Sequence, residues 1–110
     1  MGTLSVEQCS WLAREEHPGV TIYRHPSAPF WVEVDEENGV VTLSYSEDEL
    51  EDYIYELIDS GEDARSVVEE ALSELESCAR HLAMQKGYVL ESIARTMNDI
   101  LDRVEELEEE

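Results

Sequence analysis

Hydrophobic and polar residues alternate through one part of this chain of 110 residues, between positions 20 and 46. Side chains that alternate in this way lie on opposite faces of a β-strand, so the pattern predicts a strand starting at residue 20 and a pair of strands over 29–35 and 40–46. Asn38-Gly39 between the paired strands supplies residues that tolerate positive φ, which favours a tight hairpin turn. The alternating residues are Val20, Ile22, Phe30, Val32, Val34, Val41, Leu43 and Tyr45.

The segments on either side of this stretch carry helix start and stop signals. Ser5-Val-Glu-Gln8 has the spacing of a capping box and predicts an N-terminal helix over about residues 5–16, ended by Pro18-Gly19. Ser46-Glu-Asp-Glu49 is a second capping box, and Ser60-Gly61 closes the helix that it opens. That helix has one apolar stripe, made of Leu50, Tyr53, Ile54, Leu57 and Ile58.

Two further stretches have heptad spacing, and the first opens at Asp63 or at Ser66. Gly87 separates the two where a helix C-cap would place its glycine, which predicts an antiparallel helical hairpin. One long helix through Gly87 is the alternative, because Tyr88 and Val89 are poor N-caps. Its exposed seam would favour a homodimer. The seam residues are Val68, Leu72, Leu75, Ala79 and Leu82, then Leu90, Ile93, Met97, Ile100, Val104 and Leu107.

The predicted order α-β-β-β-α-α-α describes a single α+β domain over residues 1–110, with a small three-stranded antiparallel sheet beside three mainly acidic helices. The last helix ends in a run of glutamates, where the helix dipole disfavours negative charge. We therefore expect the tail to fray from about residue 106.

Charge changes this picture more than any motif does. The chain has 28 acidic and 7 basic residues and a formal net charge of -21, which excludes unaided binding to nucleic acid or to an anionic membrane. The N-terminus lacks the pattern of a signal peptide, and no apolar run is long enough to span a membrane, so we expect a cytoplasmic protein. Cys9 and Cys78 are then expected to be free thiols.

Candidate catalytic and metal-binding groups are sparse. Cys78 and His81 lie one turn apart on a predicted helix, and Cys9 and His17 could complete a zinc site. We favour the alternative that Cys78 is a buried free cysteine, which behaves as a small hydrophobic residue on the heptad stripe. Glu70 and Glu74 resemble the first half of the Mg²⁺ site of helical nucleotide pyrophosphohydrolases, but the later Glu-x-x-Asp motif is missing. We therefore expect no metal, no other cofactor and no enzymatic activity.

The acidic residues gather in the second half of the chain. Residues 1–45 carry seven acids and two bases, whereas residues 46–110 carry 21 acids and five bases. Between residues 47 and 63 there are nine acids and no base; on a helix this averages about one charge per 3 Å, near the charge density of a nucleic acid strand. We predict a partner-binding surface made of Glu47, Asp48, Glu49, Glu51, Asp52, Tyr55, Glu56, Asp59, Glu62, Asp63, Glu69 and Glu70.

A basic protein, such as a nuclease or a nucleic-acid-binding complex, is the partner that this surface predicts. In size and charge the chain is similar to the DNA-mimic proteins encoded by phages, including some anti-CRISPR and anti-restriction proteins, which implies an inhibitor. Two alternatives stay open: an immunity protein that neutralises a nuclease toxin, and a chaperone, since the early helix, sheet and low pI resemble type III secretion chaperones. A solvated acidic face, or adaptation to a salty host, would account for the charge without a partner.

Overall fold

The computed structural model describes residues 12–109, and its first half is a meander of four antiparallel strands. A fifth strand joins the far edge and runs parallel to the fourth, with Val89 opposite Val40. The sheet therefore has five strands in the order β1-β2-β3-β4-β5 and is mixed. The strands are β1 (Ala13–His17), β2 (Val20–Arg24), β3 (Phe30–Asp35), β4 (Val40–Tyr45) and β5 (Val89–Glu91).

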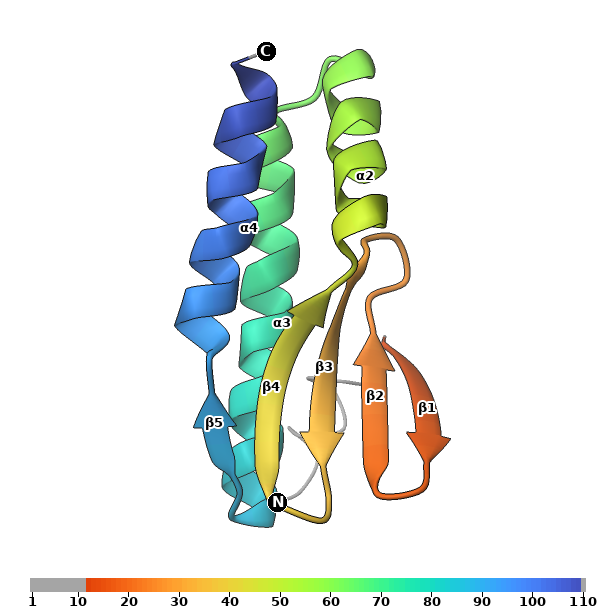
Figure 1. The fold of residues 1–110 in the computed structure, drawn as a ribbon, viewed down its shortest axis with the longest axis vertical. Coiled ribbons are helices and arrows are strands. Elements are labelled where there is room, and N and C mark those ends of the chain that lie inside the picture. The colour runs from red at the N-terminus through yellow and green to blue at the C-terminus, as the bar shows by residue number, and fades with distance from the viewer. Residues whose placement is uncertain (1–11, 110) are drawn as a thin grey trace.

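Three helices accompany the sheet: α2 (Glu47–Asp59), α3 (Ala64–Lys86) and α4 (Ile93–Glu108). In Figure 1, α3 runs along the whole molecule behind β4 and β5, while α2 and α4 stand beside it beyond the ends of the strands. One end of the molecule is thus a sheet covered by α3, and the other end is a three-helix layer. This arrangement makes the outer side of α2 part of the molecular surface.

The core forms where one face of the sheet meets α3. Side chains in β3 alternate between buried and half-buried positions, as the period of the sequence predicted. The buried strand residues pack against the apolar side of α3, and the burial of these side chains is the main stabilising contribution to the fold. Fully buried members of this core include Phe30, Val32, Val34, Val41, Val68, Leu72, Leu75, Ile100 and Val104.

The predicted three-stranded sheet and N-terminal helix are both wrong for the described residues. Residues 13–16 form strand β1 instead of the end of a helix, and the rest of the predicted helix, 5–11, lies outside the described residues. Pro18-Gly19 is the turn between β1 and β2, and Gly19 has a φ of 78° there. The β1 sequence Ala-Arg-Glu-Glu-His lacks apolar alternation, so this segment is a strand because it pairs with β2.

The predicted hairpin is confirmed, with a longer turn than a two-residue Asn-Gly loop. Asp35 pairs with Val40, so four residues make the turn. The Asp35 carboxylate accepts hydrogen bonds from the backbone N–H groups of Glu37 (3.1 Å) and Asn38 (3.0 Å), and Gly39 has a φ of 68°. Gly39 therefore supplies the positive φ of the turn, and the hydrogen bonds to the Asp35 carboxylate fix the backbone of Glu37 and Asn38.

The helix ends agree with the local signals. Ser46 caps α2 by accepting from the Glu49 N–H at 3.5 Å, and Asp63, one of the two predicted starts, caps α3 by accepting from the Ser66 N–H at 3.3 Å. Gly87 ends α3 in the left-handed conformation, with a φ of 74°. A single long helix is thereby excluded, and α3 and α4 form a hairpin whose connection contains β5.

The second heptad stretch is divided by that connection. Leu90 lies in β5, whereas Ile93, Ile100, Val104 and Leu107 are buried in α4. These four side chains pack within the chain, so the exposed seam that a long helix would have offered to a second copy does not form. A homodimer remains a prediction, but the exposed seam of a long helix no longer supports it. The helix extends to Glu108, and fraying of the tail also stays a prediction.

Cys78 is fully buried and disulfide-bonded, so the expectation of a free thiol is wrong at this position. Cys9 lies outside the described residues. Disulfides persist mainly in oxidising compartments, which is a point against the expected cytoplasmic location. Among residues 12–109, no helix has both the length and the apolar character needed to cross a membrane.

Candidate partner-binding surface

Helix α2 buries one side and exposes its acids on the other. Leu50, Ile54 and Leu57 are the buried residues, and they recur at the spacing of one helix face. Four residues of the predicted surface recur on the opposite side of the helix and form an acidic row, and all four are exposed: Asp48, Asp52, Glu56 and Asp59. The hydrophobic pattern alone therefore determined which side of the helix presents charge.

The structure brings most of the predicted surface residues together on one helix. Eight of the twelve lie on α2, two lie in its connection to α3, and Glu69 and Glu70 lie on α3. Eleven are exposed, and Glu51 is half-buried. Asp63 has a structural role as the N-cap of α3, so its carboxylate is partly occupied.

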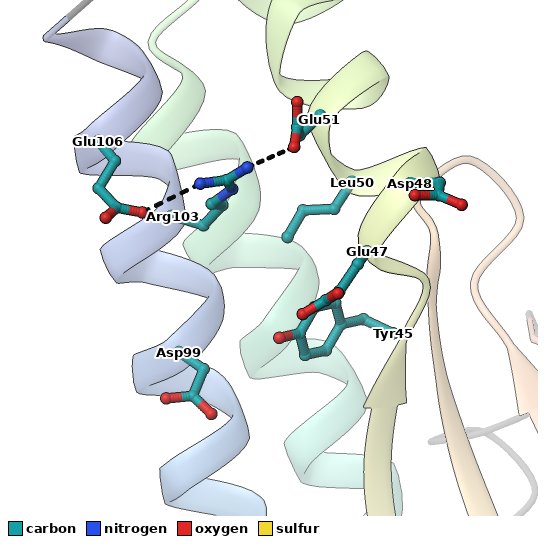
Figure 2. A pocket seen from close by; sticks show the side chains of 8 residues that line it. All are labelled: Tyr45, Glu47, Asp48, Leu50, Glu51, Asp99, Arg103 and Glu106. Carbon is teal, nitrogen blue, oxygen red and sulfur yellow. Dashed lines mark hydrogen bonds and ion pairs between the residues drawn. The ribbon is translucent and has the colours of Figure 1, made fainter.

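A cleft of about 380 Å³ separates α2 from α4. Arg103 of α4 lies across it and forms ion pairs with Glu51 of α2 and with Glu106 of its own helix, the latter at 3.3 Å (Figure 2). The hydrogen bond to Glu51 is the main cause that raises the pKa of Arg103, followed by the bond to Glu106. This arginine therefore joins two acidic helices whose charges would otherwise repel each other. The cleft is lined by Tyr45, Glu47, Asp48, Leu50, Glu51, Asp99, Arg103 and Glu106.

Tyr45 closes the sheet side of this cleft. Glu47 lines the same cleft, and Figure 2 labels both side chains. Burial raises the pKa of the Tyr45 hydroxyl, and the nearby charges of Glu47 and Asp99 raise it further. The phenol thus stays neutral and leaves an apolar ring beside the acids.

The contribution of α4 was missed from the sequence. Asp99, Arg103 and Glu106 follow one another at intervals of four and three, so they share one face of the helix. That spacing was a usable signal. Nothing in the sequence, however, indicated that this face lies beside α2, because 52 positions separate Glu51 from Arg103.

A second cleft, of about 420 Å³, lies on the opposite flank of α2, between this helix and the β2–β3 loop. Arg24 at its edge pairs with Glu15 at 2.8 Å and lies over the Trp31 ring, 4.9 Å from the ring centroid. Tyr53 packs edge-on against Phe30 at 6.0 Å. The cleft is lined by Arg24, His25, Pro26, Ser27, Ala28, Pro29, Glu49, Asp52, Tyr53 and Glu56.

Acidic residues on α3 have cationic neighbours of their own. Glu69 pairs with Arg65 at 3.4 Å and Glu76 pairs with Arg80 at 2.9 Å, each one helical turn apart. On α2, by contrast, Glu51 is the one acidic residue that forms a salt bridge with another described residue. The predicted residue Glu69 is therefore partly neutralised, whereas the row on α2 is not.

The zinc and magnesium sites suggested by the sequence are not seen among the described residues, which do not include Cys9. Residues 12–109 contain no group of three or more His, Cys, Asp or Glu side chains placed to hold a metal ion. Cys78 cannot act as a thiolate ligand or nucleophile while it is disulfide-bonded. Glu70 and Glu74 are exposed on α3.

Comparison of this chain with protein families, with curated protein sequences and with solved structures finds no match.

Proposed function

We propose that this protein is an inhibitor that binds the basic nucleic-acid-binding surface of a target protein, in the manner of a DNA mimic. The observation that carries the proposal is the outer side of α2. There a row of exposed carboxylates is bordered by two clefts that acidic residues help to line. Within residues 12–109, the salt bridge of α2 is the one between Glu51 and Arg103.

The electrostatic reason is the repulsion between the carboxylates of this row. Acids one turn apart on a helix are separated by about 5.4 Å along its axis, so their charges repel each other and favour a cationic neighbour. A basic protein surface supplies several cations at once and accelerates encounter through long-range attraction. The inhibitor would thereby occupy the groove that the target uses for phosphates.

Specificity needs more than charge, because rim charges mainly affect the rate of association. Tyr55 lies among the acids and has 39% of its surface exposed, which makes it the aromatic residue of α2 best placed to contact a partner. Tyrosines are frequent among the residues that dominate binding energy at interfaces. We therefore assign Tyr55 an anchoring role and the surrounding carboxylates a steering role.

A secretion chaperone is the second candidate, and β5 is the observation that favours it. The resemblance to type III secretion chaperones implies strands late in the chain, and β5 is such a strand. The early helix on which the resemblance was also based is not found at residues 13–17, which form β1. An immunity protein would use the same acidic surface against a nuclease toxin. The identity of the partner separates these functions. An intracellular nucleic-acid-binding target implies the cytoplasm, whereas the disulfide at Cys78 is typical of an oxidising compartment.

The test is affinity capture with matched variants. The wild type and a variant with Asp48→Asn, Asp52→Asn and Glu56→Gln are used to capture partners from lysates of the native host and of bacteria that carry defence systems. A control variant with Glu16→Gln, Glu37→Gln and Glu91→Gln removes the same number of charges from exposed positions on or beside the strands. Bound proteins are eluted with increasing salt and identified by mass spectrometry.

We expect the wild type and the control to retain a nuclease or nucleic-acid-binding complex that salt or competing DNA displaces. The α2 variant should bind it at least about tenfold more weakly at low salt, as the loss of roughly 1.4 kcal/mol would cause. Equal loss in both variants would mean that net charge alone matters and would contradict a site on α2. Capture of an unfolded secreted protein would replace the inhibitor with the chaperone.

A further inference from the structure

The β2–β3 loop is closed by the side chain of a histidine. The Nδ1 atom of His25 accepts hydrogen bonds from the backbone N–H groups of Ser27 at 3.1 Å and Ala28 at 3.0 Å. The His25 backbone N–H donates to the Phe30 carbonyl at 3.0 Å, which completes the loop. The ring thus takes the place of a backbone acceptor in a tight turn.

This arrangement needs one protonation state of the ring. A nitrogen that accepts hydrogen bonds carries a lone pair, so the imidazole must be neutral with its proton on Nε2. A protonated Nδ1 becomes a donor and faces two N–H donors that it cannot pair with. Protonation at this atom therefore breaks both backbone hydrogen bonds to the ring, whereas the backbone bond from His25 to Phe30 does not depend on the protonation state.

The loop is connected to α2 and forms one wall of the second cleft. The Pro29 carbonyl accepts a hydrogen bond of 3.2 Å from the backbone N–H of Ser46, the N-cap residue of α2. The charge of Glu74 on α3 acts on the His25 ring. Other charged and titratable groups of the described residues line the same cleft as His25: Arg24 on β2, and Glu49, Asp52, Tyr53 and Glu56 on α2. A change in the loop thus changes a surface that borders the acidic row.

We propose that the β2–β3 loop is a pH-sensitive element, closed by the neutral imidazole of His25 and opened when this imidazole takes up a proton. The opened loop releases the Ser27 and Ala28 N–H groups and places a positive charge beside the acids of α2. This device belongs to the protein itself and does not depend on the identity of a partner.

The electrostatic balance at the ring agrees in direction with this device. Burial lowers the pKa of His25 below its ordinary value of 6.5, and the negative charge of Glu74 opposes that effect. A histidine in an open loop binds a proton more readily than in the closed loop. The closed form is therefore fully stable above about pH 6.5 and loses stability as the pH falls below it.

The test follows the free protein by NMR between about pH 8 and about pH 5, the range in which histidines change charge. The ring resonances of His25 report its protonation, and amide exchange of Ser27 and Ala28 reports loop opening. We expect the protection of these two amides to fall several-fold with the midpoint of the His25 ring. The amides of Val32 and Val34 in β3 should remain protected, which distinguishes loop opening from unfolding.

Two variants make the result specific. In His25→Asn the side-chain oxygen can accept the same two N–H groups, as in an Asx turn, and it does not titrate, so the loop should stay closed throughout. His17→Asn removes an exposed histidine that lies 3.5 Å from Glu15, and it should keep the transition of the wild type.

Two results would overturn the inference: a His25 ring that titrates while the Ser27 and Ala28 amides stay unchanged, or a transition that persists in His25→Asn. If His25→Asn does not fold, the wild type still tests the inference: the pH midpoint of the His25 ring and that of the Ser27 and Ala28 amides must coincide.

Discussion

The helices α2 and α3 are both acidic, yet they manage their charge differently. On α3, Arg65 and Arg80 each lie one turn from a glutamate and pair with it. On α2 no base interrupts the acids, and the arginine that it contacts comes from α4. A helix adapted for solvation alone commonly pairs its charges along its own surface, as α3 does. The difference therefore indicates that the outer side of α2 is suited to external cations.

The two helices also differ in how deeply they are embedded. Helix α3 passes behind the sheet and contributes nine buried residues, whereas α2 contributes three and lies beyond the strands (Figure 1). A helix held by few buried contacts depends more on its ends and on its charged neighbours. Stability experiments can therefore separate the structural role of α3 from the surface role of α2.

The largest effect is expected from truncating a leucine in the buried helix. Leu72→Ala in α3 should lower the free energy of unfolding by about 2–5 kcal/mol, because the fully buried side chain leaves a cavity that its neighbours cannot fill. Leu57→Ala in α2 should cost less, since that side chain keeps 9% of its surface exposed near the end of its helix. Urea unfolding measures both, and a larger cost at Leu57 would contradict this ranking.

An intermediate effect is expected at the two glycines that follow these helices. Gly61 and Gly87 have φ values of 78° and 74°, and a Cβ atom at either position would meet no atom within 4 Å. Replacement by alanine should thus cost only the backbone strain of the left-handed conformation, about 1–2 kcal/mol at each position.

The control for this experiment is asparagine at the same positions, because its side chain tolerates the left-handed region and should cost less than alanine. Thermal unfolding followed by circular dichroism compares the four variants. Similar losses of stability at Gly61 and at Gly87 would show that α2 and α3 end in the same way and differ only in charge and burial. A neutral Gly87→Ala would mean that the connection to β5 can adopt another conformation.

The smallest effect is expected from removing the arginine between α2 and α4. Arg103→Gln leaves Glu51 and Glu106 without their cation, so the midpoint of thermal unfolding should fall slightly at low salt. The loss should shrink as salt screens the repulsion between the helices. Arg80→Gln, which breaks a pair within α3 alone, is the matched control and should have a smaller effect. Equal effects would contradict a role for Arg103 in joining the helices.

Local signals predicted one strand pair and the ends of two helices, although the predicted sheet and N-terminal helix were wrong. The hairpin of β3 and β4, the caps at Ser46 and Asp63 and the stop at Gly87 each depend on residues that lie close together in the chain. The exposed row on α2 was predicted for the same reason, because the positions of its apolar residues determine its opposite face. The capping box at Ser46 therefore predicted the start of α2 from local sequence alone.

Pairing between distant segments was beyond these signals. Residues 13–17 contain good helix formers, yet they form β1 because β2 supplies hydrogen-bonding partners for an extended backbone. Residues 89–91 are too few to show a period, and they form β5 because the α3–α4 connection brings them beside β4. The first cleft was missed for the same reason, since its walls come from two helices far apart in the sequence.

The sequence by itself determined where acids concentrate, which side of α2 is apolar, and where α2 and α3 start and stop, since these properties depend on neighbouring residues and on helical periodicity. The tertiary structure decided that the sheet has five strands, that α4 lies beside α2, and that His25 closes a loop at the edge of the acidic surface. Each of these depends on contacts between segments separated by many residues. Such contacts form only when the whole chain buries its apolar side chains together.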